Sequence, residues 1–179
     1  SVFQAVISEN SVALFDCEFT DGVQICVGTL NGASVEARRC TFEGSGFALL
    51  QSGSGTVVES CSFVDLGANY FMNVTGSGIV IDANHFGPLI MSVFFKFHFV
   101  SFSGVISNNV FEDMTNFRPV ILIYPQCNGG VEIHNNIFRD ITCFGGVVHV
   151  DTTCSTDRSL VLEENVFSNC SITQAEGKA

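Results

Sequence analysis

The chain has 179 residues, of which 46% are hydrophobic and only 14% are charged, and this composition excludes an intrinsically disordered protein. Seven basic against eighteen acidic residues give a net charge of −11 at pH 7, which argues against nucleic-acid binding. No apolar run is long enough to span a bilayer, and the length indicates a single domain over residues 1–179.

A short phrase recurs seven times along the chain: an alternating apolar stretch, then Cys or Asn, one further residue, and Phe. In chain order, its first position is Cys17, Cys40, Cys61, Asn84, Asn109, Asn136 and Asn165. Its second is Phe19, Phe42, Phe63, Phe86, Phe111, Phe138 and Phe167. Successive Phe positions lie 21 to 29 residues apart, and a repeat of this length is typical of a solenoid protein.

Each phrase follows a predicted strand in which apolar residues alternate with more polar ones. In chain order these strands cover residues 12–14, 35–37, 56–58, 79–81, 104–106, 131–133 and 160–162. Further apolar runs follow several phrases, at residues 23–27, 47–50, 120–124 and 147–150. Because no convincing helical period is present, the sequence predicts an all-β chain with two or three short strands per repeat and no substantial helix.

Such a repeat predicts one coil of a parallel β-solenoid, in which equivalent residues stack at about 4.8 Å. An inward stack of Phe explains why the chain has 18 Phe residues but no Trp, because an indole would not fit a narrow repeated slot. Stacked Asn side chains can pass amide hydrogen bonds from coil to coil. Cys is a small, burial-tolerant substitute at the same position.

Three segments carry a resemblance to a known fold: Ser107-Asn-Asn-Val-Phe-Glu-Asp113, His134-Asn-Asn-Ile-Phe-Arg-Asp140 and Glu164-Asn-Val-Phe-Ser-Asn169. The chain resembles the right-handed parallel β-helix of the pectate-lyase-like superfamily from about Val12 to Asn169. The seven phrases predict about seven coils of 21–29 residues each. The resemblance implies coils of the type found in polysaccharide lyases and hydrolases, phage tailspikes and surface proteins. Because solenoid ends expose apolar core, we expect a fragment of a longer solenoid.

The outward positions two residues before each Cys or Asn form a predicted stripe: Phe15, Arg38, Glu59, Asp82, Ser107, His134 and Glu163. The resemblance makes this stripe a candidate sugar groove, with Glu59, Asp82 and His134 as candidate catalytic residues. Glu59 and Asp82 fall on successive coils and could approach to about 5 Å, which suits two cooperating carboxylates. In the competing interpretation the charges pair along the stripe. Arg38 would then bind Glu59. His134 would bind Glu163.

An acidic series two residues after most of the Phe positions could bind calcium through its oxygen donors. Its members are Asp21, Asp65, Asp113, Asp140 and Asn169. Gly44 and Pro88 interrupt the series, and a short polar side chain after a strand more often caps a turn. Turn capping is the favoured interpretation, so no metal site and no cofactor are predicted, with Ca²⁺ as the alternative.

The eight cysteines fall into two sets. Cys17, Cys40 and Cys61 belong to the repeated phrase, where their parallel Cβ directions hinder bridging. The others lie outside it, and stacking of adjacent coils predicts two disulfides among them, Cys127–Cys154 and Cys143–Cys170. Free buried thiols are the alternative.

Two functions are consistent with these features. The first is a non-enzymatic structural or adhesive module of a larger extracellular or cell-surface protein, with further coils or neighbouring subunits as partners. The alternative is a polysaccharide lyase, a glycoside hydrolase or a carbohydrate-binding module that uses the outward strand face, with glycans as ligands. The N-glycosylation patterns at Asn73 and Asn169 agree with a secreted glycoprotein.

Overall fold

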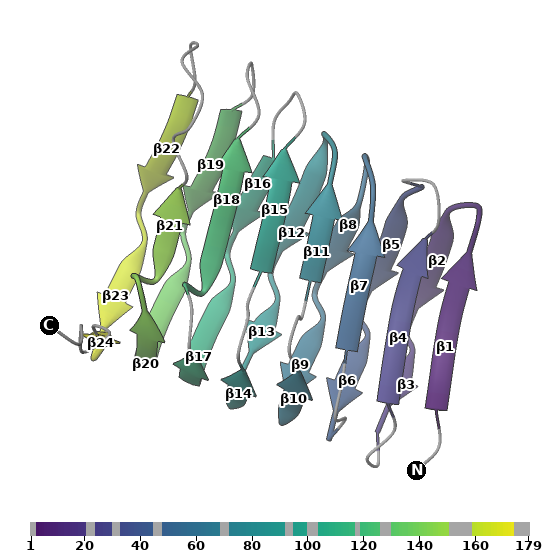
Figure 1. Ribbon diagram of the computed structural model, residues 1–179, viewed down its shortest axis with the longest axis horizontal. Coiled ribbons are helices and arrows are strands. Elements are labelled where there is room, and N and C mark those ends of the chain that lie inside the picture. The colour runs from purple at the N-terminus through teal and green to yellow at the C-terminus, as the bar shows by residue number, and fades with distance from the viewer. Residues whose placement is uncertain are drawn as a thin grey trace, which may run out of the picture.

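The computed structural model describes residues 3–20, 24–29, 33–44, 48–68, 72–91, 95–99, 104–116, 119–125, 130–150 and 159–173. Every helix or strand assigned within these ranges is a β-strand. The strands form three sheets in which every pairing is parallel. Figure 1 shows the strands of each sheet side by side from one end of the solenoid to the other.

The three sheets each take strands from successive repeats. The first sheet contains β1 (Phe3–Ser8), β4 (Gln24–Thr29), β7 (Ala48–Ser52), β11 (Met72–Thr75), β15 (Phe95–Phe99), β18 (Ile121–Pro125) and β21 (Val148–Val150). The second sheet contains β2 (Val12–Phe15), β5 (Val35–Arg38), β8 (Val57–Glu59), β12 (Ile79–Asp82), β16 (Gly104–Ser107), β19 (Gly130–His134) and β22 (Ser159–Glu163). The third sheet contains β3 (Glu18–Phe19), β6 (Thr41–Glu43), β9 (Ser62–Val64), β10 (Leu66–Ala68), β13 (His85–Phe86), β14 (Leu89–Met91), β17 (Val110–Asn116), β20 (Ile137–Phe144), β23 (Val166–Ser168) and β24 (Ser171–Thr173).

This arrangement confirms an all-β parallel β-solenoid, with no helix among the residues described. Four turns are described without interruption and contain a strand from each sheet. They cover residues 3–20, 48–68, 72–91 and 130–150. The structure therefore establishes about four turns rather than the predicted seven.

The chain bends sharply between the second and third sheets at one residue in each repeat, directly before the Cys or Asn of the phrase. These residues all have φ between 53° and 56°: Asp16, Arg39, Ser60, Ala83, Asn108, Asn135 and Glu164. A positive φ is unusual for non-glycine residues and reverses the local course of the backbone. The identical bend in each repeat places the following Cys or Asn at the same inner corner.

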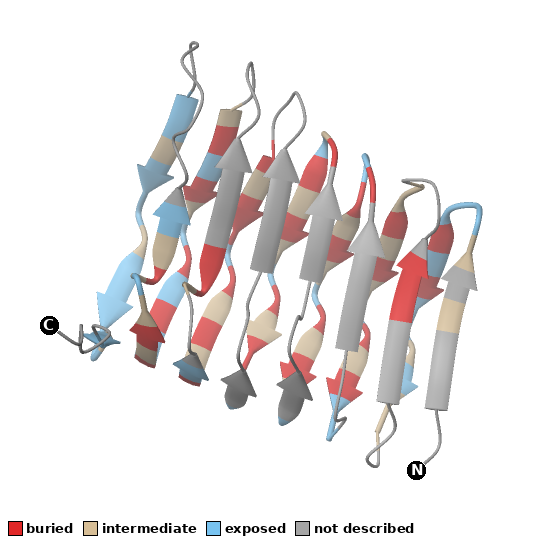
Figure 2. Cartoon of the chain, viewed as in Figure 1, coloured by how far each residue is buried: buried red, intermediate tan, exposed pale blue. Residues whose placement is uncertain are grey.

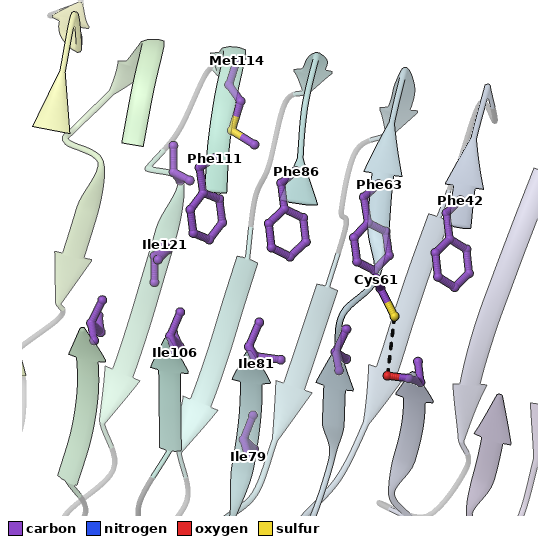
Figure 3. Close-up of a cluster of buried hydrophobic side chains, with 14 of the residues drawn as sticks. Phe42, Cys61, Phe63, Ile79, Ile81, Phe86, Ile106, Phe111, Met114 and Ile121 are labelled. Atoms are coloured by element: carbon purple, nitrogen blue, oxygen red, sulfur yellow. Dashed lines mark hydrogen bonds between the residues drawn. The ribbon is translucent and has the colours of Figure 1, made fainter. Parts of the chain in front are cut away.

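The Phe side chains of the phrase form a single stack inside the solenoid (Figure 3). Neighbouring ring centroids lie 4.8 to 5.0 Å apart and the ring planes differ by 3° to 13°. The spacing between parallel strands imposes this nearly face-to-face geometry. Phe86, Phe111 and Phe138 are fully buried, so each contributes about 2–3 kcal/mol of burial free energy.

The Asn side chains of the phrase form a ladder of hydrogen bonds parallel to the Phe stack. Asn109 Nδ2 donates to the Ile81 carbonyl at 2.9 Å and to Asn136 Oδ1 at 2.9 Å. Asn109 Oδ1 accepts from the Asn84 backbone amide at 2.9 Å and from Asn84 Nδ2 at 3.0 Å. Each buried Asn therefore has partners in both neighbouring coils, which offsets the cost of burying an amide.

In the N-terminal coils, Cys occupies the ladder position and makes the equivalent hydrogen bonds. The Cys61 thiol donates to the Ala37 carbonyl at 3.5 Å, which is the bond marked in Figure 3. Its sulfur also accepts from the Cys40 backbone amide at 3.4 Å. The Cys and Asn residues thus make one continuous ladder, with weaker bonds in its cysteine part.

Candidate functional site

The seven residues of the predicted outward stripe lie in one row across the second sheet. Strand register pairs them successively in the order Phe15, Arg38, Glu59, Asp82, Ser107, His134 and Glu163. Six of them keep part of their surface in solvent, whereas Ser107 is buried at 5% exposure. The row is therefore a nearly continuous polar line along the solenoid.

The two candidate carboxylates, Glu59 and Asp82, are neighbours in this row but are bonded to other groups. Glu59 forms an ion pair with Arg38, which also binds Glu36 Oε1 through Nε at 2.7 Å. Asp82 Oδ1 accepts from Ser107 Oγ at 2.6 Å and from Asn108 Nδ2 at 2.7 Å. The contact between Arg38 and Glu59 is the one expected if opposite charges of the stripe pair with each other.

His134, the third candidate, does not join the two carboxylates. It lies two strands from Asp82, which corresponds to a separation of roughly 10 Å between their backbones. Its Nδ1 lies 3.3 Å from Asn135 Nδ2. No ion pair between His134 and Glu163 occurs among the described residues, although the two are paired in strand register. The expected pairing of these two side chains is not formed.

A polar cluster on the third sheet was not predicted from the sequence. His85 Nε2 lies 2.7 Å from Glu112 Oε1, and the Arg139 guanidinium binds Glu112 Oε2. The hydrogen bond from His85 and then that from Arg139 lower the pKa of Glu112, while partial burial opposes this effect. The cluster links β13, β17 and β20. Both carboxylate oxygens of Glu112 are bound within it.

Gly87 explains how the chain approaches Glu112 so closely. Its φ is 140°, and a Cβ atom at this position would lie 2.0 Å from the Glu112 carbonyl oxygen. Only glycine therefore fits here without moving the backbone. The signal for this close approach is a single glycine next to a proline, which the repeated phrase does not contain.

The acidic series considered for calcium is explained by backbone conformation. Asp65, Asp113, Asp140 and Asn169 all have φ between 49° and 53°, and Gly44 has φ 66°. Asp, Asn and Gly are the residues that adopt this conformation most readily. Among the residues described, no group of three or more His, Cys, Asp or Glu could hold a metal ion. Asp21 lies outside the described residues.

The predicted Cys143–Cys170 disulfide is wrong, because both residues are free thiols. Strand register pairs Cys143 with Ile172 of β24, and Cys170 lies two residues before Ile172, directly before that strand. This offset separates the two Cα atoms by roughly 8 Å, beyond the reach of a disulfide. Cys127 and Cys154 lie outside the described residues.

The buried cysteines have the properties of core residues rather than nucleophiles. Burial raises the pKa of Cys61 to about 12 and also raises the pKa of Cys143. A thiol reacts through its thiolate, which is scarce at neutral pH when the pKa is raised.

Of the two glycosylation candidates, only Asn169 has a described side chain. It is exposed directly after β23, and its Nδ2 donates to Asp140 Oδ1 at 2.5 Å. Asn73 lies in β11, but its side chain is outside what the structure describes.

Known protein families and curated proteins yield no match to this sequence. No helix in the described part of the chain is long and apolar enough to cross a membrane. The geometry of the solenoid itself is therefore the basis for assigning a role.

Proposed function

We propose that this chain is a non-enzymatic structural or adhesive module of a larger extracellular or cell-surface protein. We place it in a right-handed parallel β-helix that forms one domain over residues 1–179. Parallel pairing of strands from successive repeats in all three sheets supports the β-helix. The resemblance to the pectate-lyase-like superfamily supports the handedness.

The observation that carries the proposal is that charged side chains on the outward faces bind one another between coils. Arg38 binds Glu59 on the next strand, and Glu112 binds Arg139 on the next strand. In both cases the contact links neighbouring rungs, as expected for a rod that is held together along its length. A carboxylate already engaged by a guanidinium is a poor general acid or base.

The interior supports the same role. Its Phe stack and its Cys and Asn ladder run from the first coil to the last, so each coil is stabilised mainly by its two neighbours. A solenoid stabilised in this way can extend as a rod, which suits a spacer or a display surface. The exposed Asn169 side chain and the −11 net charge are compatible with a glycosylated, soluble surface protein.

A carbohydrate-active or carbohydrate-binding role is the second candidate, because Glu59 and Asp82 are neighbours in the outward row. A glycan would have to displace Arg38 from Glu59 to use both carboxylates. Glycan arrays, reducing-sugar assays and unsaturated-product assays on the intact chain test this role. Turnover or binding that disappears in Glu59→Gln and Asp82→Asn would overturn the structural proposal.

Deletion of one whole coil tests the structural role directly. Removing residues 62–84 joins Cys61 to His85 and keeps the two-residue spacing between the ladder position and Phe86. We expect this variant to give a β-sheet circular dichroism spectrum and a cooperative thermal transition. Removing residues 62–83 instead adds one residue to that spacing and is the matched control, which we expect to lose the cooperative transition. Equal loss of folding in both variants would contradict the proposal.

A further inference from the structure

Two of the ladder cysteines, Cys40 and Cys61, occupy equivalent positions on neighbouring coils. The strands before and after them pair in register, β5 with β8 and β6 with β9. Both side chains are buried in the core, and Figure 3 shows Cys61 pointing into the solenoid. Their sulfur atoms are therefore separated by about the spacing of parallel strands, roughly 4.8 Å.

Hydrogen bonds hold the two thiols in the same orientation. The Cys40 Sγ atom lies 3.3 Å from the Arg38 carbonyl oxygen. The equivalent contact, from Cys61 Sγ to the Glu59 carbonyl oxygen, is 3.4 Å long. Each sulfur also lies 3.5 to 3.6 Å from a carbonyl oxygen of the preceding coil. Because these contacts repeat, the two Cβ–Sγ bonds are nearly parallel, and the line that joins the sulfurs follows the solenoid axis.

This geometry suits an ion between the sulfurs better than a disulfide. The sulfurs of a disulfide are only about 2.05 Å apart, so both side chains would have to turn toward each other. Cys40 and Cys61 are instead free thiols. A zinc–sulfur bond is about 2.3 Å long, and two bonds of that length to one ion span about 4.6 Å. An ion midway between the sulfurs thus fits with little movement of either side chain.

The surroundings select the class of ion. In the described part of the chain, no group of three or more His, Cys, Asp or Glu could hold a metal ion, so the four ligands of a structural zinc site are not supplied. No Asp or Glu is among the buried residues that the structure describes, and Ca²⁺ and Mg²⁺ bind mainly oxygen. Two thiolates in an apolar core are soft ligands of the kind that select Cu(I).

We propose that Cys40 and Cys61 bind one Cu(I) ion between their coils, as its two ligands. Two sulfur–copper bonds form and both S–H protons pass to the buffer, so the copper stays Cu(I) and no oxidant is needed. Burial in the core makes this loss of protons costly, but a coordinated thiol is deprotonated outright. The Cys40 backbone amide also donates to Cys61 Sγ at 3.4 Å and can stay in place when that sulfur becomes a thiolate. The site adds metal binding to the proposed structural role and is independent of it.

Titration of the reduced chain with Cu(I), without oxygen and in competition with a coloured Cu(I) chelator, tests the proposal. The chain has eight cysteines, so the informative quantity is the difference between variants. Cys61→Asn should lose one tightly bound equivalent and keep its circular dichroism spectrum, because Asn84 shows that Asn continues the ladder. Cys40→Asn should behave in the same way. Cys143→Ala is the matched control and should keep the equivalent, since Cys143 is also buried but pairs with Ile172 rather than with a second sulfur.

X-ray absorption at the copper edge, with one equivalent bound, identifies the ligands directly. We expect two sulfur ligands and no nitrogen or oxygen ligand. Free Cu(I) at about a hundredfold above its dissociation constant should raise the thermal midpoint by about 5 °C. An unmodified chain that binds no Cu(I) would overturn the proposal, and so would full retention of the equivalent by Cys61→Asn or its loss in Cys143→Ala. A third sulfur ligand would also overturn the two-ligand site. The coil deletion and the glycan assays are unaffected by any of these results.

Discussion

Replacing Asn109 with Ala should destabilise the solenoid strongly, because this side chain is fully buried and its amide makes four hydrogen bonds. The substitution leaves the Asn84 amide groups without their shared acceptor and the Ile81 carbonyl without its side-chain donor. At about 1 kcal/mol for each bond, the expected loss in free energy of unfolding is about 4 kcal/mol. Asn109→Cys should lose only about half as much, because Cys61 shows that a thiol at this position bonds in both directions.

Urea denaturation followed by circular dichroism measures these differences. Asn165→Ala is the matched control, since the same side chain in the last described coil is only half-buried and solvent can replace its bonds. It should reduce the free energy of unfolding by about 1 kcal/mol. The ladder would be refuted as a stabilising feature if Asn109→Ala and Asn165→Ala had equal effects, or if Asn109→Cys were as damaging as Asn109→Ala.

Two further substitutions probe the corners and the outward cluster. Ala83 has φ 53°, so Ala83→Asn should raise the free energy of unfolding by about 1 kcal/mol, and a lower thermal midpoint would contradict this. Glu112 has a lowered pKa in the folded state, so its contribution to stability is present above its unfolded value and is lost as pH falls. The difference in stability between the unmodified chain and Glu112→Gln should therefore shrink below about pH 4.3. A difference that grew on acidification would show that the bonds to His85 and Arg139 do not favour the ionised carboxylate.

The stack and the ladder were predictable because they depend on residues at fixed offsets within one repeated phrase. Parallel pairing converts equal offsets into equal positions, so Phe86 must lie beside Phe63 and Phe111 once the register is set. The outward row could be predicted in the same way, because side chains alternate between the two faces of a strand. The spacing of Glu59 and Asp82 follows from this geometry.

The features that were missed depend on a second offset. His85 follows the ladder residue directly, whereas Glu112 follows Phe, so the contact between these two side chains joins different positions of the phrase. Glu112 and Arg139 hold the same position and pair in register. The Cys143–Cys170 disulfide failed because counting from the phrase did not show that the two cysteines are offset by two residues in register. Whether two side chains at different positions of the phrase touch depends on their conformations, which the sequence pattern does not give.

The repeats differ in length, but the corner that carries the ladder does not. Successive Phe positions lie 21 to 29 residues apart, while the left-handed residue, the ladder residue and the Phe keep the same order and spacing throughout. Additional residues therefore enter between these corners, where loops can lengthen at little cost in free energy. Loops held on a rigid scaffold are where binding specificity usually develops. The constant interior geometry and the varied connections are the features on which the proposed display of surfaces along a rod would depend.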